Sequence, residues 1–362
     1  MKVGIILGDQ LSLSLPTLQA LDKKRDRLVM AEVPAEATYV GHHKQKIAFI
    51  FSAMRHFAAD LREAGWQLDY LAYGDHDHTS LLDVLVPRDF AQTRALYFTH
   101  AKPQGAGAGT AVARATLSGD GRSLTDWQVI WEMEPGSSGG RHFGSRIVEA
   151  PDGHLFVTSG ERGDRPSAQD LSRQNGSVIR IARDGTPPAD NPFQGQGGAQ
   201  PGIWSYGHRN PQGMFYNRQT NTLWAIEHGP RGGDEINLVE PGKNYGWPEA
   251  SHGKEYWGPV AVGEKEVKGM ENAKKVYVPS IAPSGLVQYQ GNAFPDLQGD
   301  LLTGAMALQH LNHIEMDGQK VVDEHRYFED KKQRIRNVIE GPDGFLYLAN
   351  DSGEIWQVKP AQ

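Results

Sequence analysis

The chain has 362 residues, no cysteine and a formal net charge of −7 at pH 7. The absence of cysteine excludes disulfides, thiolate metal sites and cysteine nucleophiles. The negative charge gives no general attraction to nucleic acid or to an anionic membrane, and no apolar run has the length of a membrane span, so neither is expected as a partner.

The first part of the chain follows an α/β pattern. Apolar runs and apolar residues at helical spacing predict, in order, two strands, an amphipathic helix and a third strand, at residues 2–7, 27–33, 43–64 and 66–73. Strand, helix and strand in this order favour a parallel, doubly wound sheet of the Rossmann type, truncated here.

Two features of this segment are open to a functional and a simpler interpretation. Gly8-Asp9-Gln10 would line a nucleotide pocket or would cap the first strand, and a lone strand-end glycine favours the cap. His42 and His43 would belong to a metal or phosphate cluster, but adjacent residues point to different faces of a helix, which favours a solvated helix start.

The polar run at residues 75–80 is the predicted join between two domains, at residues 1–78 and 79–362. Its alternating Asp and His would suit a metal, but a solvated linker is the commoner meaning of such a run. After it, a turn rich in Asp, Asn, Pro or Gly followed by an alternating apolar strand recurs at residues 151–157, 217–225, 295–302 and 342–348. These units indicate the blades of a mainly β propeller, although a β-sandwich would give a similar pattern.

Two loops contain residues that are suited to act on a substrate. His142 lies among glycines before a predicted strand, and its imidazole can accept a proton from a substrate hydroxyl near neutral pH. Arg209 and Asn210 lie in a loop that Pro211 keeps out of a helix, and their side chains suit carboxylates and quinone oxygens. The alternatives are a histidine bonded to a neighbouring turn and an arginine paired across a blade.

Glycine-rich turns in two neighbouring segments offer oxygen ligands. The first contains Gly229, Pro230 and Glu235, and the second contains Tyr245. Carboxylates and backbone carbonyls of such turns suit Ca²⁺, although an acidic turn is more often only solvated.

Two arginines near the C-terminus are predicted to share one side of a strand. Alternation places Arg334 and Arg336 together, with Ile335 on the opposite side. Such a pair would bind a ligand with several carboxylates, or would form an exposed basic strand edge.

The N-terminal segment resembles a known family. GDQLS at residues 8–12 and AEVPAEATYVGHHKQKIAFIFSAMRHFAADLREAGW at residues 31–66 are similar to the N-terminus of deoxyribodipyrimidine photolyase-related proteins. The resemblance ends near residue 75. That family places its flavin in a helical domain farther along, and nothing in this chain resembles that domain, so DNA photorepair is not expected.

The remainder of the chain resembles the soluble quinoprotein glucose/aldose dehydrogenases, also called glucose/sorbosone dehydrogenases. The resemblance rests on the segments just described, together with LLDV at residues 81–84, DFAQ at residues 89–92 and ALYF at residues 95–98. It implies a six-bladed β-propeller that holds pyrroloquinoline quinone (PQQ) in a basic pocket and uses calcium. The family's first blade should precede residue 81, so this propeller is expected to lack it. The missing blade would expose strand edges that favour misfolding or association into a homo-oligomer.

The resemblance also implies a role for each candidate residue. His142 matches the catalytic base; Arg209 and Asn210 match the pair that contacts PQQ and substrate; Gly229 and Pro230 match carbonyl ligands of the activating calcium; Glu235 and Tyr245 match a further calcium site; Arg334 and Arg336 match the arginines over the PQQ carboxylates. The family often has a lysine near the quinone, in the segment that contains Ala305 and Ala307 here. Ala307 is its nearest equivalent, which removes one contact to PQQ.

The implied reaction is oxidation of the anomeric hydroxyl of an aldose to a lactone, with hydride transfer to PQQ, assistance by Ca²⁺ and later transfer of electrons to an acceptor. Two alternatives remain: an inactive truncated propeller that acts as a carbohydrate-binding or interaction remnant, and a calcium-dependent propeller lactonase. Members of the family act in the periplasm. The start MKVGIILGDQLS shows no signal peptide, so the chain as encoded is expected in the cytoplasm.

Overall fold

The computed structural model describes residues 2–6, 11–31, 44–71, 80–105 and 107–360. The chain divides into two compact units, residues 1–81 and 82–362. Several sequence predictions concern residues outside the described ranges: the boundary between residues 78 and 79, residues 75–79 of the polar run, Gly8-Asp9-Gln10 and His42-His43.

The first unit contains a three-stranded sheet in the order β1-β2-β3. Its elements are β1 (Val3–Ile6), α1 (Pro16–Gln19), β2 (Arg27–Ala31), α3 (Lys44–Glu63) and β3 (Leu68–Leu71). Both pairings are parallel, as the order of strand and helix predicted. Alternate residues of β1 and β2 pack against the helix, and the buried cluster includes Ile6, Leu28, Met30, Met54 and Leu61. The Rossmann-type assignment stays a prediction.

The second unit is mainly β and has five antiparallel sheets. The first contains β4 (Ser80–Leu85), β5 (Ala95–Gln104), β6 (Gly107–Leu117) and β7 (Leu124–Glu132); the second contains β8 (Gly144–Glu149), β9 (Leu155–Ser159), β10 (Ser177–Ile181) and β11 (Ile203–Tyr206). The third contains β12 (Pro211–Asn217), β13 (Thr222–Glu227), β14 (Asp234–Val239) and β15 (Lys275–Tyr277). The fourth contains β16 (Pro283–Gln288), β17 (Leu301–Ala305), β18 (His310–Asp317) and β19 (Lys320–Tyr327); the fifth contains β20 (Ile335–Glu340), β21 (Leu346–Asn350) and β22 (Ile355–Val358).

Short helical turns connect some of these strands: α4 (Phe90–Thr93), η1 (Arg165–Gln169), η2 (Pro295–Leu297) and η3 (Glu329–Lys331). The recurring turn–strand units found in the sequence correspond to one position in the sheets, because β9, β13, β17 and β21 are each the second strand of their sheet. None of the helices in the described part of the chain is long and apolar enough to cross a membrane.

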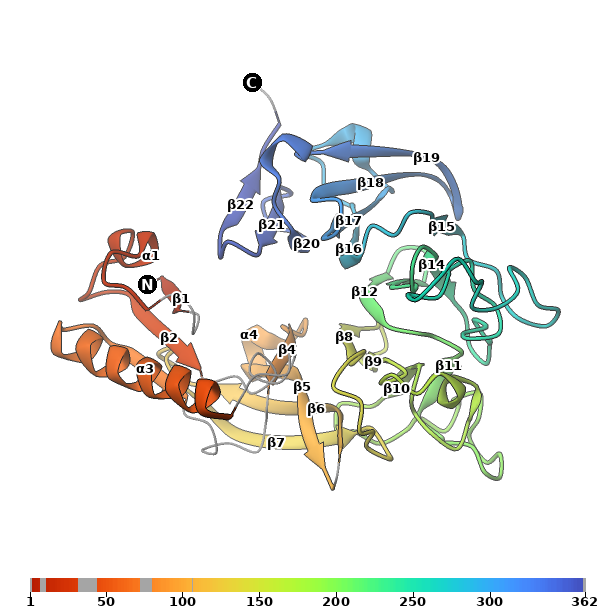
Figure 1. The fold of residues 1–362 in the computed structure, drawn as a ribbon, viewed down its shortest axis with the longest axis horizontal. Helices are drawn as coiled ribbons and strands as arrows, with labels where there is room; N and C mark the ends of the chain where they lie inside the picture. Colours follow the sequence, from red (N-terminus) through yellow and green to blue (C-terminus); the bar gives the residue numbers. More distant parts are fainter. Residues whose placement is uncertain (1, 7–10, 32–43, 72–79, 106, 361–362) are drawn as a thin grey trace. The chain divides into compact units, whose positions relative to one another are not determined.

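The five sheets are arranged around a common axis as in a β-propeller, with β4, β8, β12, β16 and β20 innermost (Figure 1). Buried apolar clusters join successive sheets from the first to the fifth; each includes residues of two neighbours, such as Tyr97 with Leu155, Val178 with Met214, Trp224 with Leu286, and Val287 with Val338. Among the described residues, none of these clusters joins the fifth sheet to the first. Derivation from a six-bladed propeller without its first blade stays a prediction.

Apolar side chains are exposed on the two sheets at the ends of this series. Leu81 and Val84 of β4 are 59% and 50% exposed, and Ile339 of β20 and Ile355 of β22 are 52% and 75% exposed. These side chains are what an interrupted series of sheets would leave uncovered, since each inner sheet packs against a neighbour on both sides.

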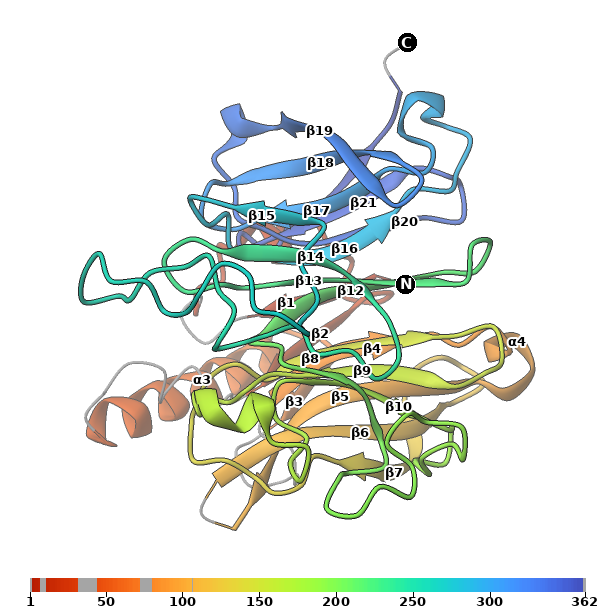
Figure 2. The ribbon, with the colours of Figure 1, turned by 90° about the vertical axis from the view of Figure 1, so that its right-hand side faces the viewer.

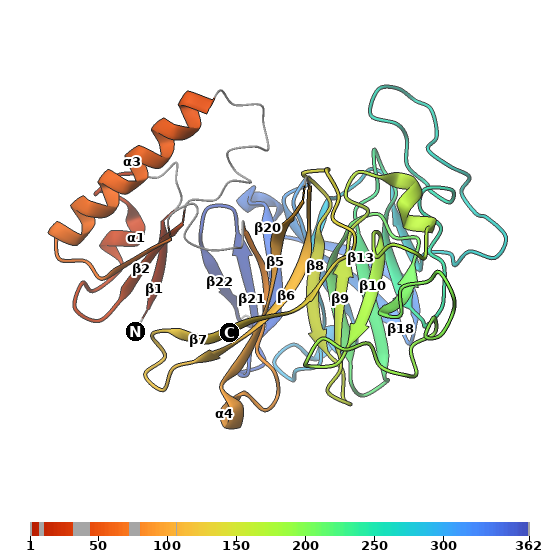
Figure 3. The same cartoon turned by 90° about the horizontal axis from the view of Figure 1, so that it is seen from below.

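The antiparallel order gathers particular loops at one end of the strands. In the second to fifth sheets the innermost strand begins where the second strand ends, so the loops before β8, β12 and β20 lie at the same end as those after β9, β13, β17 and β21. We call this end the site face. Figure 3 shows the strands from the side, with η1 and the long connection after β14 at one end and α4 at the other. The same connection projects from the sheets in Figure 2.

Candidate active site

His142 and Glu161 form a pair on the site face. His142 lies in the loop before β8 and has a φ of 55°. Its Nδ1 contacts Oε1 of Glu161, whose side chain is 1% exposed and which also accepts a hydrogen bond of 2.9 Å from the amide of Gly163. Because Nδ1 is engaged, Nε2 is the ring nitrogen available to a substrate.

The surroundings of His142 favour the neutral imidazole. Burial lowers the pKa of His142 below its usual value of 6.5, and the charge of Arg209 lowers this pKa further, while the hydrogen bond to Glu161 opposes both effects. A neutral ring whose Nδ1–H points to a carboxylate can accept a proton at Nε2, which is the arrangement that a general base requires.

Arg162 holds the loop that contains His142. This buried guanidinium donates hydrogen bonds to the carbonyls of Gly139 and Arg141 and lies 3.2 Å from the centre of the Phe143 ring. Burial lowers the pKa of Arg162 to about 10, so it remains charged at neutral pH. A Cβ at Gly139 would lie 1.7 Å from the carbonyl oxygen of Arg162, so this approach requires glycine.

Arg209 and Asn210 lie directly beside this loop, in the connection before β12. The amide of Glu161 donates a hydrogen bond of 2.9 Å to the Arg209 carbonyl. Asn210 Oδ1 accepts hydrogen bonds of 3.1 Å from the Gly144 amide and from the Gln212 side chain. The structure therefore brings together His142, Arg209 and Asn210, which the sequence placed in two separate loops.

The guanidinium of Arg209 keeps its positive charge available. Its Nη1 donates hydrogen bonds of 2.9 Å to the carbonyls of His228 and Gly229, and its Nη2 lies 3.4 Å from the Tyr256 hydroxyl. It lies 5.2 Å from the centre of a Trp247 ring. In the described part of the chain the partners of this guanidinium are neutral groups, unlike those of an arginine paired across a blade, so an anionic ligand would find an uncompensated charge here.

Asp234 fixes the turn that contains Gly229 and Pro230. Its Oδ1 accepts hydrogen bonds from the Gly229 amide (2.8 Å) and the Ser280 hydroxyl (2.9 Å), and its Oδ2 accepts two from the amides of residues 281 and 282 (2.8 and 2.9 Å). The predicted calcium ligands of this turn have protein donors in the structure: the carbonyl of Gly229 accepts from Arg209, and that of Pro230 lies 3.4 Å from the Ser280 hydroxyl.

Glu235 faces a second carboxylate. Residues 227 and 235 are direct partners across the antiparallel pair of β13 and β14. Burial and the negative charge of Glu227 raise the pKa of Glu235 well above its usual value of 4.5. Oδ1 of Asn237, on the same strand, is buried without a partner among the described residues. Two carboxylates and an unpaired amide oxygen form a donor set that suits a hard cation such as Ca²⁺.

Tyr245 lies close to this pair, through His208. The imidazole Nδ1 of His208 lies 2.9 Å from Oε1 of Glu227, and its ring stacks on that of Tyr245 with centres 4.6 Å apart. The Tyr245 hydroxyl donates to the Leu238 carbonyl at 2.5 Å, and burial raises its pKa well above 10. The hydroxyl is therefore engaged within the protein, which leaves the backbone of Tyr245 as its contribution to a cation site.

Arg334 and Arg336 share a side of the chain, as alternation predicted, with Ile335 buried on the other side. Both side chains form ion pairs with Asp351, and they are 48% and 51% exposed. Two guanidiniums against one carboxylate leave one excess positive charge, and their exposure leaves both accessible to a ligand.

The two alanines of the predicted quinone segment differ in exposure. Ala305, at the end of β17, is fully buried in the apolar cluster between the third and fourth sheets. Ala307 follows in the exposed turn, and its amide donates a hydrogen bond of 2.9 Å to the Ile281 carbonyl. Only the second position therefore offers a side chain at the site face.

The connection between β14 and β15 adds aromatic residues that the sequence analysis did not single out. Tyr256 and Trp257 are 63% and 75% exposed, and Tyr256 reaches Arg209 as described above. Glu255 is held by Arg165 of η1 through two hydrogen bonds of 2.6 and 2.9 Å. Exposed aromatic rings beside a cationic site suit a sugar ring or a flat cofactor.

Replacement of Glu161 by glutamine is expected to move the acidic limb of the kcat/KM profile. In the wild type this limb should lie below pH 6.5, because the folded pKa of His142 is lowered. Since Glu161 is the group that raises this pKa, its loss should move the limb to still lower pH. A pH–rate series on both proteins measures this. A fall in rate without any movement of the limb would mean that Glu161 only supports the fold.

The comparisons with known proteins agree with this geometry. The described part of the chain is a propeller-like arrangement of sheets with a histidine–carboxylate pair and an arginine with neutral partners on one face. Residues 71–357 match the family model Glucose / Sorbosone dehydrogenase, and the chain belongs to this family. The aldose sugar dehydrogenase YliI of Escherichia coli (strain K12) is 44% identical over 291 residues, which are 79% of this chain and 78% of the relative.

Solved structures show the same fold. The apo-form of the soluble aldose sugar dehydrogenase from Escherichia coli has a TM-score of 0.74 and 42% identity, over 78% of this chain and 83% of that chain. The PQQ-bound aldose sugar dehydrogenase from Streptomyces coelicolor has a TM-score of 0.63 and 26% identity, over 77% of this chain and 79% of that chain.

The N-terminal resemblance is also confirmed. Residues 4–118 match the family model Deoxyribodipyrimidine photo-lyase-related protein, which extends beyond the predicted end near residue 75. The (6-4) photolyase of Agrobacterium fabrum is 60% identical over 77 residues, which are 21% of this chain and 15% of that protein. Because so little of that protein is matched, we infer no activity from it.

Proposed function

We propose that the chain oxidises the anomeric hydroxyl of aldose sugars to lactones, with PQQ as the hydride acceptor and Ca²⁺ as an assisting ion. The observation that carries this proposal is the contact of His142 with the buried Glu161 beside the Arg209–Asn210 loop. The names of the relatives, an aldose sugar dehydrogenase and a PQQ-bound aldose sugar dehydrogenase, support the same assignment.

His142 would act as the base. Its Nε2 accepts the proton of the sugar hydroxyl while Nδ1–H remains directed to Glu161, whose negative charge stabilises the imidazolium that forms. PQQ, when bound, would take up the hydride from the anomeric carbon. Arg209 presents its charge where negative charge would develop, and Tyr256 and Trp257 would limit access of water.

Arg209, Arg334 and Arg336 would hold PQQ. The fit rests on two observations: the Arg209 guanidinium has neutral partners among the described residues, and the other two arginines share a single carboxylate. A cofactor with several carboxylates matches this excess of positive charge. Asn210 would make a polar contact to the cofactor or the substrate. Ala307 would lie near the quinone without making a charged contact to it.

Calcium would use oxygen ligands at two places. We assign the carbonyls of Gly229 and Pro230 to the ion that assists the reaction, and Glu235 with the backbone of Tyr245 to a second ion. The paired carboxylates of Glu227 and Glu235, together with the unpaired Asn237 oxygen, fit a cation at the second place. Three further points stay predictions: location in the periplasm, transfer of electrons to an acceptor, and association into a homo-oligomer.

Removal of both exposed arginines should weaken the binding of PQQ. The variant Arg334→Ala/Arg336→Ala loses two charged donors, and at 1.4 kcal/mol per factor of ten we expect a loss of affinity of about 10- to 100-fold. A fluorescence or absorbance titration measures the dissociation constant. The matched control, Arg122→Ala/Lys320→Ala, removes two exposed charges from the β6–β7 and β18–β19 turns, at the end of the strands opposite to the site face, and should bind as the wild type does. Equal affinity in both variants would mean that the arginine pair only faces solvent.

Titration of the full chain with PQQ in the presence of Ca²⁺, followed by absorbance, tests the proposed function. Saturable binding that requires Arg209 supports it. Hydrolysis of an aldonolactone without PQQ would instead favour the propeller lactonase. Binding of sugar without any binding of PQQ would favour the inactive carbohydrate-binding remnant.

A further inference from the structure

A group of metal-ligating side chains lies on the outer strands of the fourth sheet, away from the site face. Glu315 of β18 and Asp323 and His325 of β19 each direct one donor atom to a common place, with all three atoms within 4.8 Å of one another. The site face contains the start of β18 and the end of β19, whereas this group is closer to the hairpin that joins them at residues 317–320. It is therefore separate from His142 and Arg209.

The strand register brings these residues together. Glu315 pairs directly with Asp323, and His313 pairs with His325. Residues two apart on a strand share a face, so all four side chains lie on the same face of the hairpin. This face also contains Leu311, which belongs to the apolar cluster between the fourth and fifth sheets. The fourth sheet has four strands and the fifth has only three, β20 to β22. Beyond the apolar cluster, this face of the β18–β19 hairpin is therefore open to solvent.

The arrangement has an electrostatic cost without a cation. Glu315 and Asp323 are like charges directly opposite each other in an antiparallel pair, which destabilises the sheet. Within the described part of the chain, neither carboxylate has an ion pair with lysine or arginine, and Glu315 contacts His325 at 3.4 Å. A divalent cation between the two carboxylates would remove this repulsion and use the imidazole as a third ligand.

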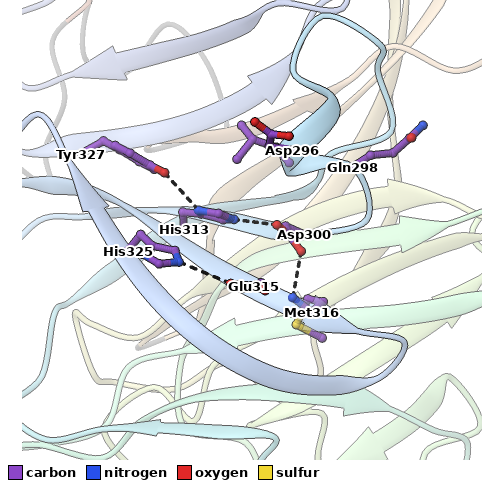
Figure 4. A pocket seen from close by; sticks show the side chains of 9 residues that line it. Asp296, Gln298, Asp300, His313, Glu315, Met316, His325 and Tyr327 are labelled. Carbon is purple, nitrogen blue, oxygen red and sulfur yellow. Dashed lines mark hydrogen bonds and ion pairs between the residues drawn. The ribbon is translucent and has the colours of Figure 1, made fainter.

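A second observation also points to a ligand. A hollow of about 400 Å³ lies over this face, lined by Glu315, His325 and His313 among others (Figure 4). His313 is 5% exposed, and its Nε2 lies 2.7 Å from Oδ2 of Asp300, whose other oxygen accepts a hydrogen bond of 2.8 Å from the Met316 amide. Its Nδ1 faces the Tyr327 hydroxyl at 3.4 Å. The His313 ring lies against that of His325, with ring centres 5.2 Å apart, so this hydrogen-bonded network fixes one side of the proposed imidazole ligand.

We propose that Glu315, Asp323 and His325 bind a divalent first-row transition-metal ion such as Zn²⁺, with the hollow leaving room for water or a further ligand. An imidazole with two carboxylates suits such ions, whereas Ca²⁺ and Mg²⁺ take oxygen ligands only. His313, Asp300 and Tyr327 support the position of His325 and its neighbours. This site is independent of the proposed sugar oxidation, and its test needs neither PQQ nor sugar.

Isothermal titration of the full chain with ZnCl₂ tests the proposal, with the wild type compared to His325→Ala, Asp323→Asn and the control Asp317→Asn. Asp317 is exposed on the same strand as Glu315 and outside the group, so its variant should bind as the wild type does. We expect one Zn²⁺ site that each of the other two variants weakens by about 100-fold, since loss even of supporting groups costs 10- to 100-fold. CaCl₂ should give no comparable binding at this site.

The ligand residues are largely exposed, with side chains of His325 and Glu315 at 43% and 48%, so in the presence of a chelator His325→Ala should unfold as the wild type does. Asp323→Asn, which removes the repulsion between Glu315 and Asp323, should unfold at the same or a slightly higher temperature. Zinc should raise the unfolding temperature of the wild type and of Asp317→Asn only. The same zinc isotherm in the wild type and in His325→Ala, or no zinc binding by the wild type, would overturn the proposal.

Discussion

Replacement of His142 by alanine is expected to lower kcat for aldose oxidation by about 1,000-fold, within the range by which a positioned general base accelerates proton transfer. The reason is that Nε2 of His142 is the available nitrogen of a ring fixed by a buried carboxylate. The binding of PQQ should change little, because the groups assigned to its carboxylates are arginines in other loops. Dye-linked turnover and a PQQ titration on the same preparation separate the two effects.

A matched control for this variant is His154→Ala. His154 lies in the turn between β8 and β9, at the end of the strands opposite to the site face, and pairs with Asp152. It should retain the turnover of the wild type. Loss of PQQ binding in His142→Ala with unchanged chemistry on the bound fraction would refute the assignment of His142 as the base.

Replacement of Asp234 by alanine is expected to lower the free energy of unfolding by about 3 kcal/mol, the cost of leaving buried partners of a charged group unsatisfied. Asp234 is 1% exposed and accepts four hydrogen bonds, which connect the Gly229 turn to residues 280–282. Three of the donors are backbone amides, which cannot turn to find other acceptors. Urea unfolding followed by circular dichroism measures the change.

The control for Asp234→Ala is Asp317→Ala, which removes an exposed carboxylate from a strand and should change the free energy of unfolding by less than about 0.5 kcal/mol. Since the Gly229 and Pro230 carbonyls are assigned to calcium, Asp234→Ala should also raise the concentration of Ca²⁺ that turnover requires. An unchanged urea midpoint would mean that water replaces the carboxylate without cost.

Local patterns in the sequence predicted much of the fold. The Pro151 and Pro342 turns, each followed by alternating apolar residues, correctly gave β9 and β21, because the turn chemistry and the two-residue period are local properties. The parallel sheet of the first unit followed in the same way from strand, helix and strand. The number of sheets and the lack of a cluster between the fifth and the first depend on packing across the ring, which local patterns do not contain.

Site residues that lie within a single loop could be predicted from the sequence. Contacts that depend on the pairing of two strands could not. His142 and the Arg209–Asn210 pair were found because glycine and proline mark their loops. Glu161 was missed because its contact with His142 follows from the pairing of β8 with β9, which brings the end of one to the start of the other. Asp351, which pairs with Arg334 and Arg336, was missed for the same reason at β20 and β21.

Register also explains the acidic pairs that the sequence did not reveal. Glu227 and Glu235 are separated by a glycine-rich turn, and only the pairing of β13 with β14 places them face to face. Glu315 and Asp323 are brought together in the same manner by β18 and β19. In both cases a shift of one residue would move one partner to the other face of the sheet, so the sequence alone could not predict the contact.

The most direct test of the proposed function is dye-linked oxidation of glucose by the purified full chain, measured with PQQ and Ca²⁺ together, with each alone and with neither. The proposal predicts turnover only when both are present, and its loss in His142→Ala measured beside the wild type. Equal rates in all four conditions, or no oxidation with both present in a chain that binds PQQ, would contradict the assignment of this propeller as a PQQ-dependent sugar dehydrogenase.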